Sequence, residues 1–132
     1  MAVNPIELRA RREALGLHQH ELASWLNVAQ ATVSAWELGR RTIPAGIHSE
    51  LAELEEQLLD IADRMIEAGE AAGEDCVLFT YLDDSQLAAA HPEMDGWPAA
   101  LHRVAAAHAA AELRAAGVHT TIATKPTNNQ SH

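Results

Sequence analysis

The chain has 132 residues, 48% of them hydrophobic, which is enough for one domain or for two small domains that share a core. A single cysteine, Cys76, excludes an intrachain disulfide and fits a reducing cytoplasm. No apolar run approaches the ~20 residues of a membrane-spanning helix, and the first residues lack the apolar core of a signal peptide. The net charge of −10 argues against a general nucleic-acid binder. We therefore expect a soluble, cytoplasmic protein with no membrane partner.

The negative charge is confined to the second half of the chain. Residues 1–46 hold five arginines and four glutamates (net +1), whereas residues 47–116 hold three arginines and fifteen acidic residues (net −12). This distribution is compatible with a DNA-reading N-terminal part followed by an acidic C-terminal part. It is equally typical of a solvated surface that keeps the body soluble, and we assign most of these carboxylates to that role. Repulsion from DNA phosphates should keep the acidic half away from the duplex.

The first 45 residues predict three short helices. Asn4 can cap a helix that begins at Pro5, and Gly16 can end it. A second helix is expected from about 18 to 26 and a third from about 30 to 38, joined by a tight turn. The apolar anchors of these last two helices are Leu22, Leu26, Val33 and Trp36. Small and polar residues lie between the anchors, as in a helix that packs on a core and turns its other face toward a groove.

The run LRARREALGLHQHELASWLNVAQATVSAWELGRRTIP resembles the helix-turn-helix domain of the lambda-Cro/repressor (XRE) family. The resemblance covers roughly the first 45 to 60 residues and is specific, because several features agree at the right offsets. These features are Arg12, Gly16-Leu17, Gln19, Glu21-Leu22-Ala23, Val28, Thr32-Val33-Ser34, Trp36-Glu37 and Gly39. The resemblance implies an N-terminal domain of four to five helices like that of lambda repressor.

The resemblance also implies that the third helix lies in the major groove of DNA. The side chains that would face base edges or nearby phosphates are Gln30, Ala31, Thr32, Ser34 and Ala35. Gln30 is the best base reader of these, because its amide can pair with both N7 and N6 of an adenine. Ala31 can contact a thymine methyl group.

Other positions carry implied roles around that helix. Gln19 would bind a backbone phosphate and brace the base-reading glutamine, and Arg40 and Arg41 would hold phosphates from the loop after the third helix. Arg12 and Glu37 resemble the family's internal ion pair, which ties the first helix to the third. Because buried ion pairs are weak stabilisers, we expect this pair to orient the helices rather than to stabilise them.

Two positions depart from the family pattern. His18 stands where a Ser, Thr or Asn cap is usual, so the second helix either begins less firmly or gains a pH-sensitive contact. Ala35 stands where Arg or Gln is common, so few side chains are available for direct base readout. DNA shape or a second DNA-contacting segment would then add to specificity. The alternative is a helix-turn-helix that has lost DNA binding and serves as a protein-protein module.

Residues 46–72 are expected to form one long helix. This helix either connects the two halves of the chain or forms the contact between two copies. Its apolar residues begin at Ile47 and continue through Leu51, Leu54, Leu58, Ile61 and Met65, with spacings of 4, 3, 4, 3 and 4. One interpretation is a dimer seam formed by Leu51, Leu54, Leu58, Ile61 and Met65. The other is a helix packed inside its own chain, which the widening of the stripe through Leu59, Ala62 and Ile66 favours. Both interpretations stay open on the sequence.

Residues 73–124 predict a small α/β cap in the order strand, helix, helix, strand. The strands are expected over 76–82 and 118–124. Since a two-stranded sheet is marginal alone, its edges could pair across a dimer, which makes this part an oligomerisation or partner domain. It also resembles the C-terminal part of small, largely uncharacterised bacterial helix-turn-helix proteins, on Phe79-Thr80-Tyr81-Leu82, His91-Pro92-Glu93 and Gly96-Trp97. Residues 125–132 are expected to be a disordered tail.

The chain offers no convincing catalytic or metal-binding pattern. It contains eight histidines, but His102 and His108 are six residues apart and do not share a ligating edge. The pair Asp83-Asp84 is explained by helix capping. The sequence has no Gly-rich phosphate loop and no recognisable nucleophile elbow. We therefore expect no metal, no cofactor and no enzyme activity.

These patterns together predict a mainly α protein with a helix-turn-helix domain at residues 1–45. Its expected function is sequence-specific transcriptional regulation as a repressor that binds a double-stranded DNA operator. A homodimer would bind two half-sites about one helical turn (~34 Å) apart. Phage repressors, Cro-like proteins and autoregulating antitoxins all fit. The alternative is an antitoxin or protein-interaction module whose acidic C-terminal half binds a basic toxin or an effector protein.

Overall fold

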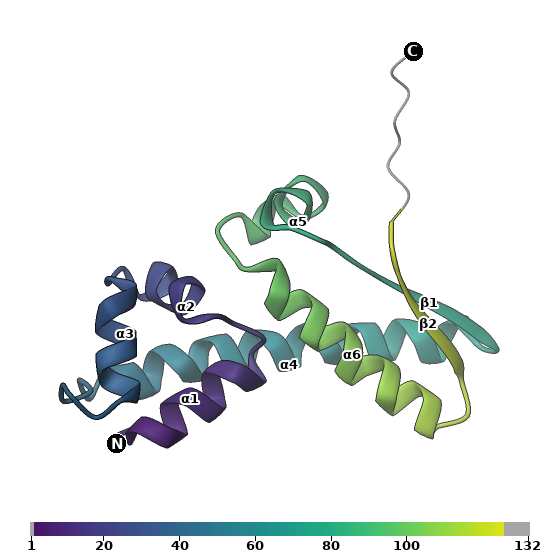
Figure 1. Ribbon diagram of the computed structural model, residues 1–132. Helices are drawn as coiled ribbons and strands as arrows, with labels where there is room; N and C mark the ends of the chain where they lie inside the picture. The colour runs from purple at the N-terminus through teal and green to yellow at the C-terminus, as the bar shows by residue number, and fades with distance from the viewer. Residues whose placement is uncertain (1, 126–132) are drawn as a thin grey trace, which may run out of the picture.

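The computed structural model describes residues 2–125, so all of the tail expected at 125–132 except Lys125 lies outside the described residues. The described part is mainly helical, with one small sheet (Figure 1). Its elements are α1 (Pro5–Ala14), α2 (Gln19–Leu26), α3 (Gln30–Glu37), α4 (Ile47–Ala72), β1 (Asp75–Thr80), α5 (Asp84–Ala90), the 3₁₀ helix η1 (Pro92–Met94), α6 (Ala99–Ala115) and β2 (His119–Thr124). The predicted order of strand, helix, helix, strand in the second half is therefore confirmed.

The short N-terminal helices end where their local signals predict. The Asn4 side chain accepts a hydrogen bond of 2.8 Å from the backbone N–H of Glu7, which satisfies a donor of the first turn of α1. Asn27, between α2 and α3, adopts a left-handed conformation with φ 58°, which asparagine tolerates better than most residues. The α2–α3 turn is therefore encoded locally.

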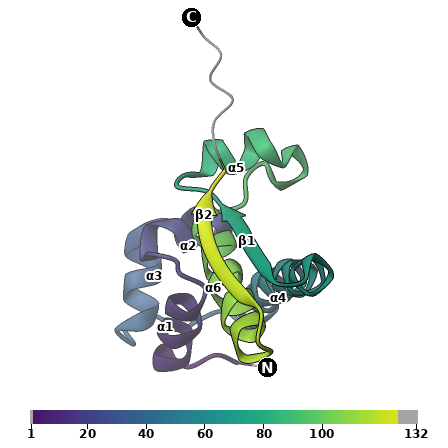
Figure 2. The ribbon, with the colours of Figure 1, turned by 90° about the vertical axis from the view of Figure 1, so that its right-hand side faces the viewer.

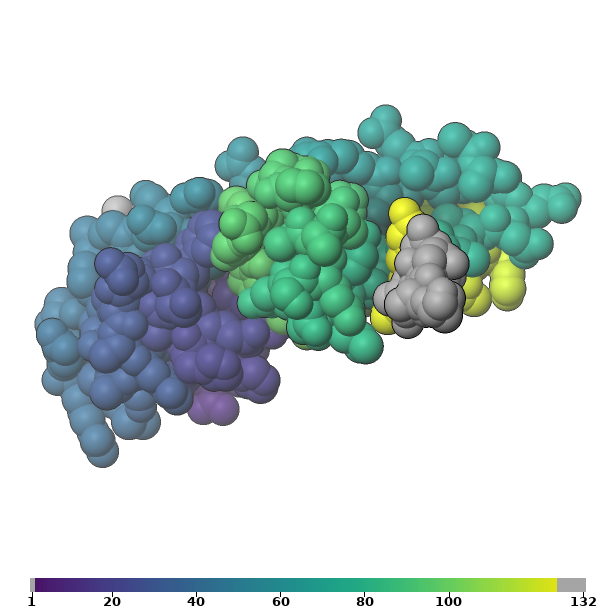
Figure 3. All heavy atoms as spheres, turned by 90° about the horizontal axis from the view of Figure 1, so that it is seen from above, coloured from purple at the N-terminus to yellow at the C-terminus, as the bar shows by residue number. Residues whose placement is uncertain are grey.

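The long helix α4 supports both halves of the molecule. Its 26 residues span about 39 Å. The helices α1–α3 lie toward its beginning, whereas α6 crosses it further along and the strands lie toward its end (Figure 1). Seen from above, the molecule is elongated, with the blue N-terminal helices at one end and yellow β2 toward the other (Figure 3).

One hydrophobic core runs through both halves. Leu8 and Val33 from the first half and Leu101 from α6 are fully buried in the same cluster. The rings of Trp25 on α2 and Trp97 before α6 lie 4.5 Å apart between centroids and add a contact across the two halves. The N-terminal helices are thus packed on the body rather than tethered to it.

The predicted dimer seam on α4 is occupied within the chain itself. Leu51 and Leu54 are fully buried, and Leu58 and Ile61 are 5% and 7% exposed in a single copy. Met65, the last position of the stripe, is partly buried against the same cluster. The rest of the hydrophobic core covers these four side chains within one chain. The intrachain packing is therefore present at Leu51, Leu54, Leu58 and Ile61, and a contact between copies through this stripe stays a prediction.

The sheet consists of two parallel strands joined by α5, η1 and α6. The register pairs Asp75 with His119 and Thr80 with Thr124. One face packs on α4 and α6, while the other carries Val77 and Phe79, which are 49% and 39% exposed. Figure 2 shows β1 and β2 side by side, with α6 behind them. The sheet therefore has one apolar face in solvent as well as two open edges.

Candidate nucleic-acid interface

The helix α3 presents a small, polar surface outward. Its inner face is fixed by Val33 and Trp36, which are buried beneath it. The five predicted contact residues occupy the other side of the helix. Gln30 and Ala31 are exposed, and Thr32, Ser34 and Ala35 are half-buried. Gln30 and Ala31 are therefore the two predicted contact residues most open to a groove.

Two arginines follow α3 directly. Gly39 adopts φ +73°, which turns the chain out of the helix. The backbone N–H groups of Arg40 and Arg41 then donate to the Ala35 carbonyl at 2.8 and 3.4 Å. Both arginines are exposed. Their loop is thereby held against the end of α3, where guanidinium groups can meet phosphates that flank a groove.

A buried ion pair orients α3 against α1. The Arg12 guanidinium donates from Nε to Glu37 Oε2 at 2.6 Å and from Nη2 to Glu37 Oε1 at 2.9 Å. The two side chains are 9% and 4% exposed. A third donor of Arg12, Nη1, bonds the Leu17 carbonyl at 2.8 Å, so the α1–α2 loop joins the same unit. The structure thus brings together the two residues that the resemblance paired.

The charge states of this pair are set by their mutual contacts. Burial alone would raise the pKa of Glu37, but hydrogen bonds from Arg12 and Gln19 outweigh it and hold that pKa below its usual range. The hydrogen bond to Glu37 raises the pKa of Arg12 against the opposite effect of burial. Both groups therefore stay charged near neutral pH.

Gln19 has a partner that the sequence did not predict. Its Nε2 donates to Glu37 Oε1 at 3.1 Å, which places the start of α2 on the same carboxylate as Arg12. The expected bracing of Gln30 is not among the hydrogen bonds of the described residues. The side chain of Gln19 remains half-buried, with its amide already engaged.

Comparison with known families agrees with this geometry. Residues 8–54 match a family model described as Helix-turn-helix. This stretch is a helix-turn-helix domain of the XRE type. The match supports a DNA-binding transcription regulator, and folds of this kind are generally non-enzymatic. No curated protein matches the chain.

The helix-turn-helix domain does not end with its third helix. The matched residues continue to Leu54, which lies within α4, so α4 supplies the fourth helix of the domain. Within the domain, most of the predicted DNA-contact residues fall in two groups, one on α3 and the other the pair of arginines after it. Gln19 lies apart from them, at the start of α2.

A second network, which spacing along the chain does not reveal, fixes the domain to α4. Arg11 donates from Nε and Nη2 to the Glu55 carboxylate at 2.8 and 2.6 Å. Its Nη1 also lies 2.9 Å from His48 Nδ1 and donates to Glu7 at 3.2 Å. Arg11 and Glu55 are 44 positions apart along the chain, so only the packed fold brings these two residues together.

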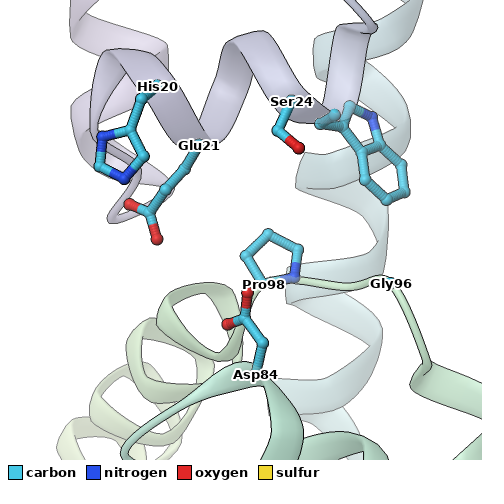
Figure 4. Close-up of a pocket in the computed structure, with 7 residues that line it drawn as sticks. His20, Glu21, Ser24, Asp84, Gly96 and Pro98 are labelled. Carbon is cyan, nitrogen blue, oxygen red and sulfur yellow. The ribbon is translucent and has the colours of Figure 1, made fainter.

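A cleft of about 440 Å³ separates α2 from the C-terminal half (Figure 4). His20, Glu21 and Ser24 lie on its α2 side and face Asp84 and Pro98 across it. Its two carboxylates are already engaged with backbone donors. Glu21 accepts from the His18 N–H at 2.8 Å, and Asp84 accepts from the Ala99 N–H at 2.7 Å. We therefore interpret these acids as helix caps and not as a chemical site.

No helix among residues 2–125 is long and apolar enough to cross a membrane. Within the same residues, no three or more His, Cys, Asp or Glu side chains come together as a metal-binding group would.

Proposed function

We propose that this protein is a transcriptional repressor that inserts α3 into the major groove of an operator. One observation carries the proposal. Gln30 and Ala31 on the outer face of α3 are exposed, and exposed Arg40 and Arg41 follow on the next loop. The buried Arg12–Glu37 pair holds that face in place. A pre-oriented helix with flanking arginines suits both base readout and phosphate binding.

The distribution of charge supports the same orientation on DNA. Residues 1–46 carry a net charge of +1, and residues 47–116 carry −12. Phosphates repel the acidic half, so only the helix-turn-helix end can approach the duplex closely. We place this activity in the cytoplasm.

We further propose that the repressor binds DNA as a homodimer assembled through its sheet. Each strand has one open edge, and exposed Val77 makes part of the outer face apolar. Pairing of two such sheets would cover these groups in a symmetric contact. Two α3 helices could then meet half-sites about 34 Å apart.

Sedimentation should give twice 14.2 kDa for the wild type and 14.2 kDa for Val77→Glu. The control Leu59→Glu changes an equally exposed apolar residue on α4 and should stay dimeric.

Operator selection from randomised DNA tests the proposed reading. The wild type should enrich one sequence, and Gln30→Ala should bind it roughly 5- to 100-fold more weakly, because one bidentate base contact is lost. The Gln30→Ala variant should lose its sequence preference at one base pair of the operator and keep it at the others. Gln57→Ala, a glutamine on α4 away from α3, is the matched control and should bind normally. Enrichment of no sequence by the wild type would overturn the proposal.

The acidic second half favours one rival function, a module that binds a basic protein such as a toxin. A net charge of −12 over residues 47–116 suits such a partner. In that case Gln30→Ala would leave the biological activity intact, whereas reversal of acidic residues on α4 would abolish it.

A further inference from the structure

A second cavity lies in the C-terminal half, and none of its lining residues belongs to α1, α2 or α3. Its volume is about 350 Å³. Small-molecule sites in proteins commonly occupy about 300–1,000 Å³. The walls come from the second half of α4, the end of β1, the 3₁₀ helix and α6. The cavity is therefore separate from the DNA-reading face.

Much of the cavity surface is apolar and polarisable. Ile61 and Met94 are buried beneath it, Met65 is half-buried, and the Phe79 ring is 39% exposed. Methionine sulfur and aromatic carbon both make favourable contacts with a flat ring. This part of the wall suits an aromatic group better than a sugar or a polyol.

A polar cluster forms another wall. His102 is 5% exposed, and its Nδ1 lies 2.8 Å from Thr80 Oγ1. Nearby, the Tyr81 hydroxyl lies 3.0 Å from His91 Nε2. Burial, with a smaller effect from His91, lowers the pKa of His102 to about 4, so the ring is neutral near pH 7. If the Thr80 hydroxyl donates to Nδ1, then Nε2 carries the proton and can donate to a ligand.

Two of the four cationic residues in 47–125 line the same cavity. Lys125, the only lysine of the sequence, and Arg64, one of three arginines in residues 47–116, both line it. The other two arginines donate to backbone carbonyls, Arg103 to those of Tyr81 and Leu82 and Arg114 to that of Thr120. Arg64 instead pairs with Asp60 on the surface and remains 66% exposed. Glu93 also lines the cavity, so its lining carries two cations and one carboxylate. In a half of the chain with a large acidic excess, this net positive lining favours an anionic ligand.

We propose that this cavity binds a small aromatic carboxylate. The aromatic ring lies against Met65, Met94 and Phe79, and the carboxylate meets Arg64 and Lys125. His102 donates to a carboxylate oxygen or a ring substituent. This site is independent of the proposed operator binding, because its residues contact neither α3 nor the arginines that follow it.

Methionine methyl resonances give a direct test on the full chain. The sequence contains three methionines, of which Met65 and Met94 line the cavity, and Met1, outside the described residues, serves as the reference signal. In protein labelled with ¹³C at the methionine methyl groups, naphthalene-2-carboxylate should shift the Met65 and Met94 signals saturably and leave Met1 unchanged. The uncharged analogue 2-naphthamide should bind more weakly.

Charge variants separate the proposal from general hydrophobic binding. Arg64→Gln/Lys125→Gln should weaken naphthalene-2-carboxylate binding by about tenfold and leave 2-naphthamide binding unchanged, because two exposed charge contacts are lost. The control Arg9→Gln/Arg40→Gln removes the same charge outside the cavity and should have no effect. The proposal is overturned if the carboxylate shifts neither cavity methionine, if it shifts all three alike, or if the amide binds equally well.

Discussion

Arg12 on α1 and Glu37 at the end of α3 form a two-point ion pair, at 2.6 and 2.9 Å, that is almost completely buried. A pair of this kind has a clear energetic asymmetry. Replacing both partners by apolar residues is often nearly neutral, whereas removing one partner leaves a buried charge without compensation. The pair therefore serves orientation more than stability, and this distinction can be measured.

Glu37→Gln should lower the free energy of unfolding by about 3 kcal/mol, because the Arg12 guanidinium stays buried without a carboxylate. The double variant Arg12→Met/Glu37→Met should lose less than the single variant. Urea unfolding followed by circular dichroism gives both values. If the double variant is the less stable of the two, the pair is a genuine stabiliser and our interpretation is wrong.

The same double variant should bind the operator more weakly than the wild type even where it is fully folded. Without the ion pair, only apolar packing sets the angle between α1 and α3. Fluorescence anisotropy with labelled operator, at a temperature well below the unfolding transition, would measure the loss. Unchanged affinity would mean that Val33 and Trp36 alone orient α3.

Stability should fall as the solution is acidified from pH 7 to pH 5.5. The pKa of His102 is lowered from its ordinary value of 6.5 to about 4, so the unfolded chain binds a proton in this window and the folded chain does not. The contribution of neutral His102 to the free energy of unfolding is fully present above about pH 6.5 and is lost as pH falls toward 4. We expect a loss of about 1 kcal/mol between pH 7 and pH 5.5 from this group. His102→Asn should flatten the dependence, whereas the exposed control His20→Asn should not.

Gly69→Ala should destabilise the fold, although alanine is the better helix former. A Cβ at this position of α4 would lie 2.5 Å from Leu113 Cδ1 and 3.1 Å from Cys76 Sγ. Leu113 is fully buried and has little room to move. We expect a net loss of about 1–2 kcal/mol by thermal or urea unfolding. Gly46→Ala, where a Cβ meets nothing within 4 Å, is the matched control and should change little.

Arg41→Gln should weaken operator binding to a similar extent on all sequences. If its guanidinium neutralises one phosphate, the slope of log K against log salt should decrease in magnitude by about 1. Titrations between low and moderate salt would give this slope. Arg64→Gln removes the same charge from the second half and should leave the slope unchanged. Equal slopes for the wild type and Arg41→Gln would remove Arg41 from the interface.

Local signals were sufficient for the helix ends and the helix-turn-helix. A cap such as Asn4 or a left-handed turn at Asn27 depends on only a few neighbouring residues, so the sequence states it directly. The stripe from Leu51 to Met65 was ambiguous for a physical reason. A helix that packs against its own chain and one that packs against a copy require the same apolar spacing. Only the packed fold shows that Leu51 and Leu54 are buried within one chain.

The contacts that sequence patterns missed join residues from distant elements. The Arg11–Glu55 hydrogen bonds and the cluster of Tyr81, His91 and His102 have no characteristic spacing, because each member is supplied by a different element. Gln19 was assigned to a phosphate from family resemblance, and its bond to Glu37 depends on how α2 and α3 cross. Such contacts follow from tertiary packing, which no short window of sequence contains.

The end of the family match at Leu54, part-way along α4, has a mechanical consequence. Within the described residues, no flexible joint separates the helix-turn-helix from the sheet, because the continuous helix α4 packs against both. A tilt of about 5° at the far end of a rod about 39 Å long displaces the near end by about 3 Å, more than a base contact tolerates. The helix α4 therefore acts as a rigid connection. A partner that binds the sheet determines the position of α3.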